Sequence, residues 1–325
     1  MGGSQVVVVT GASSGIGRAT AIRFASEGAS LVLAARRAEA LATVVAECEH
    51  AGGTAIAVPT DVSDEGAVDA LAALAVSEFG GIDVWVNDAA VSVFAPLVEA
   101  PIDDVRRVLD VNVLGTVYGA RAAVREMLRQ GKGVLINVSS VVGEVPQPYT
   151  APYGMSKAAV RALGSSLRSE LALQKAKRVH VVTVLPATID TPFFAHPANY
   201  TGRRVLAMPP VYPPEAVAKV IVKAARRPKA EIAVGPISKA MVREHRRHPE
   251  AVEAQMAVQV DTMHLSRTDD APATTGNLYE PPADPADAAI TGGWHGAGRS
   301  RGRVVAALGL VAVVGLLLAR RTEAA

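Results

Sequence analysis

The sequence of 325 residues contains one cysteine and few aromatic residues, which make up 4% of the chain. A single cysteine, Cys48, excludes an intramolecular disulfide and a metal site built from cysteines. No activating residue stands beside it, so we expect a small buried side chain rather than a nucleophile. The scarcity of aromatic rings and the net charge of only +2 argue against nucleic acid as the main partner.

Apolar residues are abundant, at 50% of the chain, which excludes an intrinsically disordered protein. Up to residue 236, short apolar runs alternate with stretches of helical spacing. The apolar runs occupy 5–9, 31–35, 54–58, 82–86, 134–138, 179–185 and 231–234. The helical stretches occupy 15–28, 37–51, 64–79, 102–130, 153–174 and 213–227. The alternation predicts an α/β fold, a doubly wound (Rossmann) parallel sheet of about seven strands with helices on both faces.

The chain divides into four predicted parts. Residues 1–240 form the Rossmann domain, and residues 241–267 form a basic helix. Residues 268–303 have the Pro, Gly and Asp content of a flexible linker. Residues 304–319 are entirely apolar, with arginines on both sides.

The apolar run 304–319 reaches about 24 Å as a helix, somewhat short of the ~30 Å hydrocarbon core of a bilayer. Flanking arginines help a short helix to span. We therefore predict a single transmembrane or membrane-anchor helix, with the Rossmann domain facing the cytoplasm. A buried core helix, a helix lying on the membrane surface and a helix packing on a partner subunit are the alternatives.

A glycine-rich turn follows the first strand and opens the first helix, which is the context required of a dinucleotide site. Its candidate coenzyme-binding residues are Gly11, Ser13, Ser14, Gly15, Ile16 and Gly17. The helix N-terminus offers free N–H groups and positive potential to phosphates. An ordinary strand–helix turn is the alternative.

The residue at the end of the second strand is Arg36, at the position where an acid would favour NAD(H). A guanidinium matches a 2′-phosphate, so we predict NADP(H), with NAD(H) less favoured; a solvated surface arginine is the alternative.

A second group of residues has catalytic potential. Tyr153 and Lys157 are four residues apart at the start of a helical stretch, so both lie on one helix face. A nearby ammonium favours the phenolate, and we expect it to lower the tyrosine pKa. Ser140 follows the strand 134–138, at the sheet edge where ligands of α/β folds bind.

Together these motifs resemble the short-chain dehydrogenase/reductase (SDR) family. Residues 10–17 are similar to its TGxxxGxG element, residues 87–90 to its NNAG, and Tyr153 with Lys157 to its YxxxK. Asn112 and Ser140 match its catalytic asparagine and serine. The resemblance covers residues 4–236, and a C-terminal extension follows.

The resemblance implies a role for each matching residue. Tyr153 is the general acid/base, Lys157 lowers its pKa and contacts the nicotinamide ribose, and Ser140 orients the substrate carbonyl. Asn112 holds a water that relays protons to Lys157. Further coenzyme contacts are implied for Asp61, Val62, Asn87, Ala89, Ile189 and Thr191. Three residues depart from the family pattern, namely Asp88, Ala90 and Ala187.

In the family, the segment 192–212 covers the substrate. Phe193 and Phe194 join Ser140 and Tyr153 as candidate substrate contacts, although they can equally pack the loop. We interpret His196 as a loop residue. His245 and His248 are spaced like a metal pair but lack a third ligand, so no metal is predicted.

The sequence thus predicts an NADP(H)-dependent oxidoreductase that interconverts a secondary alcohol and a ketone or aldehyde. The membrane segment favours a lipophilic small-molecule substrate, and the family resemblance implies a homodimer or homotetramer. The alternative is an NADP(H)-binding regulatory or scaffold protein with the same fold and little catalysis.

Overall fold

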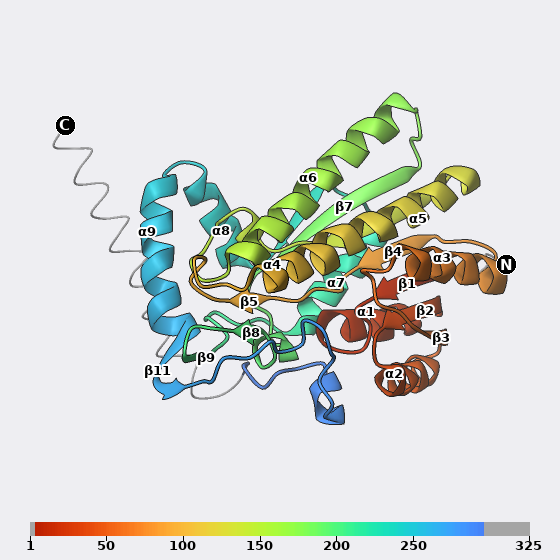
Figure 1. Ribbon diagram of the computed structural model, residues 1–325. Helices are drawn as coiled ribbons and strands as arrows, with labels where there is room; N and C mark the ends of the chain where they lie inside the picture. The colour runs from red at the N-terminus through yellow and green to blue at the C-terminus, as the bar shows by residue number, and fades with distance from the viewer. Residues whose placement is uncertain (1–3, 296–325) are drawn as a thin grey trace.

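A central parallel sheet organises the computed structural model, which describes residues 4–295 (Figure 1). The strand order is β10-β7-β6-β4-β1-β2-β3, and every neighbouring pair is parallel. The strands are β1 (Val6–Thr10), β2 (Ser30–Ala35), β3 (Thr54–Pro59), β4 (Val84–Asn87), β6 (Gly133–Val138), β7 (Val179–Pro186) and β10 (Glu231–Val234). This confirms the predicted doubly wound fold.

Helices cover both faces of the sheet because the strands are apolar on both faces. One face packs on α1 (Gly15–Ala25), α2 (Ala38–His50) and α7 (Pro214–Arg226). The other packs on α3 (Glu65–Phe79), α5 (Gly115–Gln130) and α6 (Ala151–Leu173). Successive residues of β1 separate accordingly, with Val7 and Val9 in the first apolar core and Val8 in the second.

The predicted helix 102–130 is interrupted by a π-helical turn. Helix α4 (Ile102–Leu109) leads into the π turn Asp110–Leu114, and α5 follows directly. Such π turns add one residue to a helical turn and often occur at functional sites. This one contains Asn112.

The C-terminal part forms a separate layer beside the sheet (Figure 1). The predicted basic helix is two helices, α8 (Pro236–His245) and α9 (Pro249–Gln259), followed by a π turn, Val260–His264. Strand β11 (Leu265–Asp270) then pairs antiparallel with β9 (Arg203–Val205). A further short pair joins β5 (Val93–Phe94) to β8 (Ala198–Asn199).

Residues 271–295, here called the tail, fall in the stretch predicted as a flexible linker, and the structure differs from that expectation. The tail has one short helical turn, Pro285–Ala288, and it packs on the Rossmann domain. Leu278, for example, is fully buried in the second core. Composition identifies a segment without regular structure, but it does not report long-range contacts.

Among residues 4–295, no helix combines the length and apolar character needed to cross a membrane. The predicted membrane segment, 304–319, lies outside the described residues.

Candidate active site

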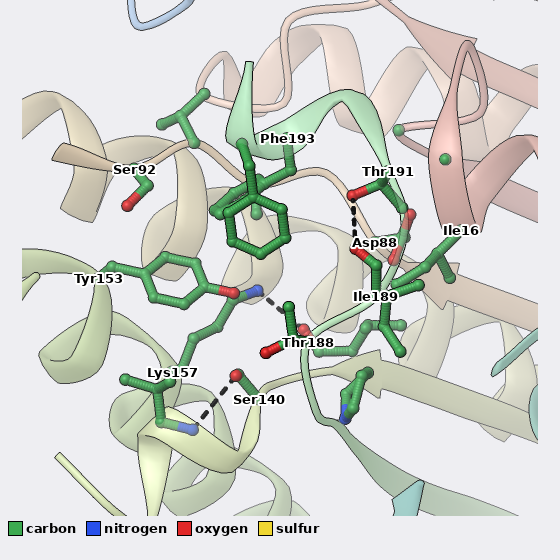
Figure 2. A pocket seen from close by; sticks show the side chains of 18 of the residues that line it. Ile16, Asp88, Ser92, Ser140, Tyr153, Lys157, Thr188, Ile189, Thr191 and Phe193 are labelled. Carbon is green, nitrogen blue, oxygen red and sulfur yellow. Dashed lines mark hydrogen bonds between the residues drawn. The ribbon is translucent and has the colours of Figure 1, made fainter. Parts of the chain in front are cut away.

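One cavity, of about 340 Å³, lies at the carboxyl ends of the parallel strands. One end of it, the turn end, is lined by the glycine-rich turn, Arg36 and Asp61. The other, the catalytic end, is lined by Ser140, Tyr153 and Lys157, and Figure 2 shows these three side chains close together. Two groups of residues chosen from separate motifs therefore share one cavity.

The glycine-rich turn is built for close backbone approach. Gly11 has φ +70°, and a Cβ there would lie 2.8 Å from the backbone nitrogen of Ala89. A Cβ on Gly17 would collide with the Gly11 carbonyl oxygen. Gly17 does not line the cavity, whereas Gly11, Ser13, Ser14, Gly15 and Ile16 do. The Gly15 N–H donates to the Ala289 carbonyl, at 3.1 Å, and the Gly17 N–H to Asp88. The positive potential of the helix start, the hydroxyls of Ser13 and Ser14 and two nearby arginines fit the phosphates of a dinucleotide.

Helix α6 and strand β6 position the catalytic residues. Lys157 is buried and donates a hydrogen bond from Nζ to the Val138 carbonyl oxygen at 2.9 Å. Its Nζ lies 5.5 Å from the centre of the Tyr153 ring. Ser140 caps the short 3-10 turn Val141–Gly143, where its Oγ accepts from the Val142 N–H at 3.2 Å. Ser139 points away and donates to the Lys157 carbonyl oxygen, as strand alternation predicts.

The pKa of Tyr153 differs from the expectation. Burial raises it, with Asp88 adding to the rise, and the hydrogen bond with Ser140 opposes them. The net change is therefore opposite to the predicted lowering by Lys157. Desolvation of the phenol outweighs an ammonium that is itself held by a backbone carbonyl.

Asp88, a departure from the family motif, shares this buried site. Its pKa is raised by burial, while Lys157 and the Gly17 N–H lower it. The pKa of Lys157 is lowered by burial, and the Asp88 charge opposes that change. The carboxylate thus helps to keep Lys157 protonated within the cavity. The sequence marked Asp88 as unusual but gave no indication of this pairing.

The side chains of Asn112 and Asn87 form hydrogen bonds with protein groups outside the cavity. Asn112 accepts from the Val91 N–H at 2.8 Å and donates to the Val91 carbonyl and to Ser156 Oγ. Asn87 bonds Trp85 and Asn137 beneath the sheet edge. Neither lines the cavity. Asn112 therefore anchors the loop after β4. The proton relay implied for Asn112 and the coenzyme contact implied for Asn87 stay predictions.

The remaining predicted coenzyme residues do line the cavity: Asp61, Val62, Ala89, Ile189 and Thr191. Asp61 is paired with Arg107, at 2.7 Å. Arg36 lines the turn end beside Arg37. Burial lowers the pKa of Arg36, and Arg107 and Arg37 lower it further, while Asp61 and Glu280 oppose this. The turn end is therefore a cluster of guanidinium groups partly withdrawn from water.

Aromatic and sulfur-containing side chains line the catalytic end. Phe193 lies between Tyr153 and Phe194, with ring centres 5.4 and 5.3 Å away. Phe94, Met208, Met241 and Met256 also line this end. Phe193 and Phe194 both line the cavity, which agrees with the first of their two alternatives, contact with the substrate. Sequence reasoning missed these methionines: Met241 on α8 and Met256 on α9 lie in helices without a motif, and Met208 was not singled out within 192–212.

His264, also missed, has a defined protonation state. Burial lowers its pKa to about 4, although a hydrogen bond to the Leu206 carbonyl oxygen opposes the shift. The ring is neutral near pH 7, and it packs edge-on against Phe94 and Phe194. Because Nδ1 donates to Leu206, Nε2 is the acceptor nitrogen of a residue that lines the cavity.

The remaining residues considered in the sequence analysis are one cysteine and three histidines. Cys48 is fully buried, and burial raises its pKa to about 12, as expected of an inert thiol. His245 and His248 face glutamates on the surface. In residues 4–295 no cluster of three metal-ligating side chains occurs. His196 does line the cavity, with Nε2 2.8 Å from Asp287 Oδ1 of the tail.

Comparison with known proteins gives a consistent family. Residues 5–199 match the family model for short chain dehydrogenase. The uncharacterized oxidoreductase YxnA of Bacillus subtilis is 37% identical, over 89% of this chain and 82% of that protein. The 3beta-hydroxysteroid dehydrogenase 1 of Eggerthella lenta is 41% identical, over 66% of this chain and 84% of that protein.

A solved structure supports the same conclusion. A short chain dehydrogenase/reductase from Burkholderia phymatum, in complex with NAD, superposes with a TM-score of 0.70 and 29% identity, over 77% of this chain and 96% of that one. The fold is one that binds a nicotinamide coenzyme. The chain therefore belongs to the short-chain dehydrogenase/reductase family of oxidoreductases, as its motifs predicted.

Proposed function

We propose that the protein interconverts a secondary alcohol and a ketone or aldehyde with NADP(H), acting on a bulky lipophilic substrate. The observation that carries the proposal is the shared cavity: Ser140, Tyr153 and Lys157 lie at one end of it, and a glycine turn with arginines lies at the other. The apolar wall between Tyr153 and α9 supplies the space for the substrate.

The chain's own residues suffice for the proton chemistry. In reduction, the Tyr153 hydroxyl donates its proton to the substrate oxygen. Burial raises the pKa of Tyr153 and keeps the hydroxyl protonated before the transfer. Ser140 Oγ donates a hydrogen bond to the same oxygen and fixes its position. Lys157, kept charged by Asp88, adds positive potential beneath the phenol. The bound nicotinamide supplies or accepts the hydride.

The preference for NADP(H) is proposed from charge. Arg36 and Arg37 line the turn end, and a 2′-phosphate would bring about two negative charges to this pair of guanidinium groups. Asp61, the nearest acid, is already neutralised by Arg107. A ribose hydroxyl alone would gain much less from this field.

The substrate class is proposed from the wall composition. The rings of Phe94, Phe193 and Phe194 with three methionines suit a rigid or bulky hydrocarbon skeleton. The Eggerthella lenta relative, named as a 3beta-hydroxysteroid dehydrogenase, supports an alcohol carried on such a skeleton. The predicted anchor at 304–319 supports a substrate drawn from a membrane.

Sedimentation with lipid vesicles tests the membrane anchor. The full chain is compared with the quadruple variant Leu308→Asp, Val311→Asp, Val314→Asp and Leu317→Asp.

Assembly into a homo-oligomer is also proposed. Leu97, Val98, Ile102 and Leu114 are exposed apolar side chains in or next to α4 and its π turn, and a second copy would cover them. Analytical ultracentrifugation of the wild type and of Val98→Glu tests this.

A carbonyl panel tests the proposed activity directly. The full chain is assayed with NADPH and NADH against steroid ketones, terpenoid ketones, medium-chain aldehydes and small polar ketones, following coenzyme absorbance. We expect turnover of the bulky lipophilic ketones with NADPH. Binding of NADPH with no turnover of any carbonyl would favour the regulatory alternative.

A further inference from the structure

The tail lies across the turn end of the cavity, and Figure 1 shows it running from β11 towards α2. Four arginines donate hydrogen bonds to its backbone carbonyls. Arg36 reaches Asn277 at 2.7 Å and Tyr279 at 2.8 Å. Arg107 reaches Leu278 at 3.0 Å. Arg18 and Arg37 hold the carbonyls of Ala288, Pro282 and Asp287.

These contacts come from separate elements of the Rossmann domain. Arg18 is on α1, Arg36 and Arg37 join β2 to α2, and Arg107 is on α4. The Gly15 N–H at the start of α1 also donates to the Ala289 carbonyl at 3.1 Å. Hydrogen bonds from a charged donor are stronger than neutral ones, so the set holds the tail at one defined position.

The outer attachments of the tail are equally specific. Leu278 is buried in the second core, and the Tyr279 hydroxyl donates to the buried carboxylate of Asp104 at 2.8 Å. The Asn277 N–H donates to the His196 carbonyl at 3.0 Å. Leu278, Tyr279 and Asn277 therefore attach the start of the segment 277–289 to the Rossmann domain and to the loop of His196.

The side of this segment that faces the cavity is formed by Asn277, Pro281, Pro282 and Asp287, with the glycine-rich turn and Asp61 among the other residues that line the same cavity. The Asn277 Oδ1 atom is buried and accepts no hydrogen bond from the described residues. A buried acceptor without a donor is unfavourable. A ligand in the cavity that carries a hydroxyl or amino group would satisfy it.

We propose that the segment 277–289 forms the outer wall of the coenzyme site. The adenosine half of the dinucleotide lies between the glycine-rich turn and the tail, and Asn277 Oδ1 accepts a hydrogen bond from it. The tail stays closed over the bound coenzyme, so coenzyme exchange requires the tail to open. This inference rests on the proposed function for the presence of the dinucleotide.

The similarity to the Bacillus subtilis relative is not confined to the Rossmann domain. Its match extends over 293 residues and covers 89% of this chain, so the similarity extends beyond the Rossmann domain into the C-terminal part. The match to the Eggerthella lenta relative covers 66%.

Hydrogen–deuterium exchange of the full chain tests the enclosure. Amides of 277–289 are compared without ligand, with NADPH and with NADH. We expect exchange in this segment to slow when coenzyme is bound. Faster or unchanged exchange with bound coenzyme overturns the proposal alone. Failure of the chain to bind either dinucleotide, read by coenzyme fluorescence, overturns it together with the proposed function.

Asn277→Ala tests the contact, with Thr275→Ala as the matched control on an exposed residue two positions earlier. Loss of one hydrogen bond predicts about five-fold weaker coenzyme binding by fluorescence titration. The control should bind like the wild type. Equal affinity of the two variants overturns the Asn277 contact. The exchange experiment uses the unsubstituted chain, so it tests the enclosure even if Asn277→Ala folds poorly.

Discussion

The two ends of the cavity are made from different chemical groups. At the catalytic end, side chains from β6 and α6 carry the chemistry, and Lys157 is fixed by a strand carbonyl. At the turn end, the outer wall is main-chain carbonyl groups of the tail, held by arginine side chains. The first end depends on residue identity. The second depends on where arginines stand, because every residue of the tail has a carbonyl.

Removal of the Tyr153 hydroxyl should separate the two ends most sharply. In Tyr153→Phe the proton donor is lost while the turn end is untouched, so kcat should fall by about 10²–10⁴-fold. Coenzyme affinity, measured by fluorescence titration, should not change. Tyr118→Phe on α5 is the control and should keep full activity. A Tyr153→Phe enzyme with normal turnover would contradict the assigned role.

Acid should destabilise the catalytic end through His264. Its folded-state pKa of about 4 lies below the ordinary 6.5, so protonation favours the unfolded chain. The free energy of unfolding should be unaffected by this group above about pH 6.5 and should fall towards pH 4, by up to about 3 kcal/mol. Urea unfolding across this range measures it.

His264→Gln should flatten that dependence, because glutamine does not titrate. His50→Gln, at an exposed position on α2, should leave it as in the wild type. The same acid sensitivity in all three proteins would remove His264 from the explanation.

At the turn end, Arg36→Asp distinguishes recognition of the 2′-phosphate from support of the tail. Loss of a charged hydrogen bond predicts at least about ten-fold weaker NADPH binding, with NADH binding much less affected. Direct titration of both coenzymes measures the ratio. Equal losses for NADPH and NADH would assign Arg36 to the tail alone.

The smallest effect is expected from Tyr279→Phe, which removes one hydrogen bond between the tail and Asp104. Tail amides should exchange about five-fold faster, while amides of β6 and α6 keep their protection. Hydrogen–deuterium exchange reads both regions in one experiment. Faster exchange throughout the domain would show that the two ends are not independent.

Most of the fold could be predicted, because buried parallel strands are continuous apolar runs and each one is bounded by a turn. The prediction of an uninterrupted helix over 102–130 was wrong, because a π turn interrupts it. This π turn places Asn112 against Val91, a contact between residues 21 apart in sequence, and helical spacing is insensitive to one added residue.

Within the site, spacing on one helix face was enough to bring Tyr153 and Lys157 to the same cavity. The direction of the Asn87 side chain depends on partners such as Asn137, which the sequence does not indicate. The roles of these residues stay predictions. The tail could not be predicted because its arginine partners lie 170 or more residues away in sequence. The anchor at 304–319 stays a prediction.

The buried carboxylate of Asp190 accepts hydrogen bonds from the backbone N–H groups of Gly292, Trp294 and His295. It thereby fixes the last described residues next to Thr191 and Phe194. Eight residues separate His295 from Val304, a tether of at most about 30 Å. If 304–319 enters a bilayer, Asp190 determines which face of the enzyme meets the lipid, and that face is the one that carries the substrate wall.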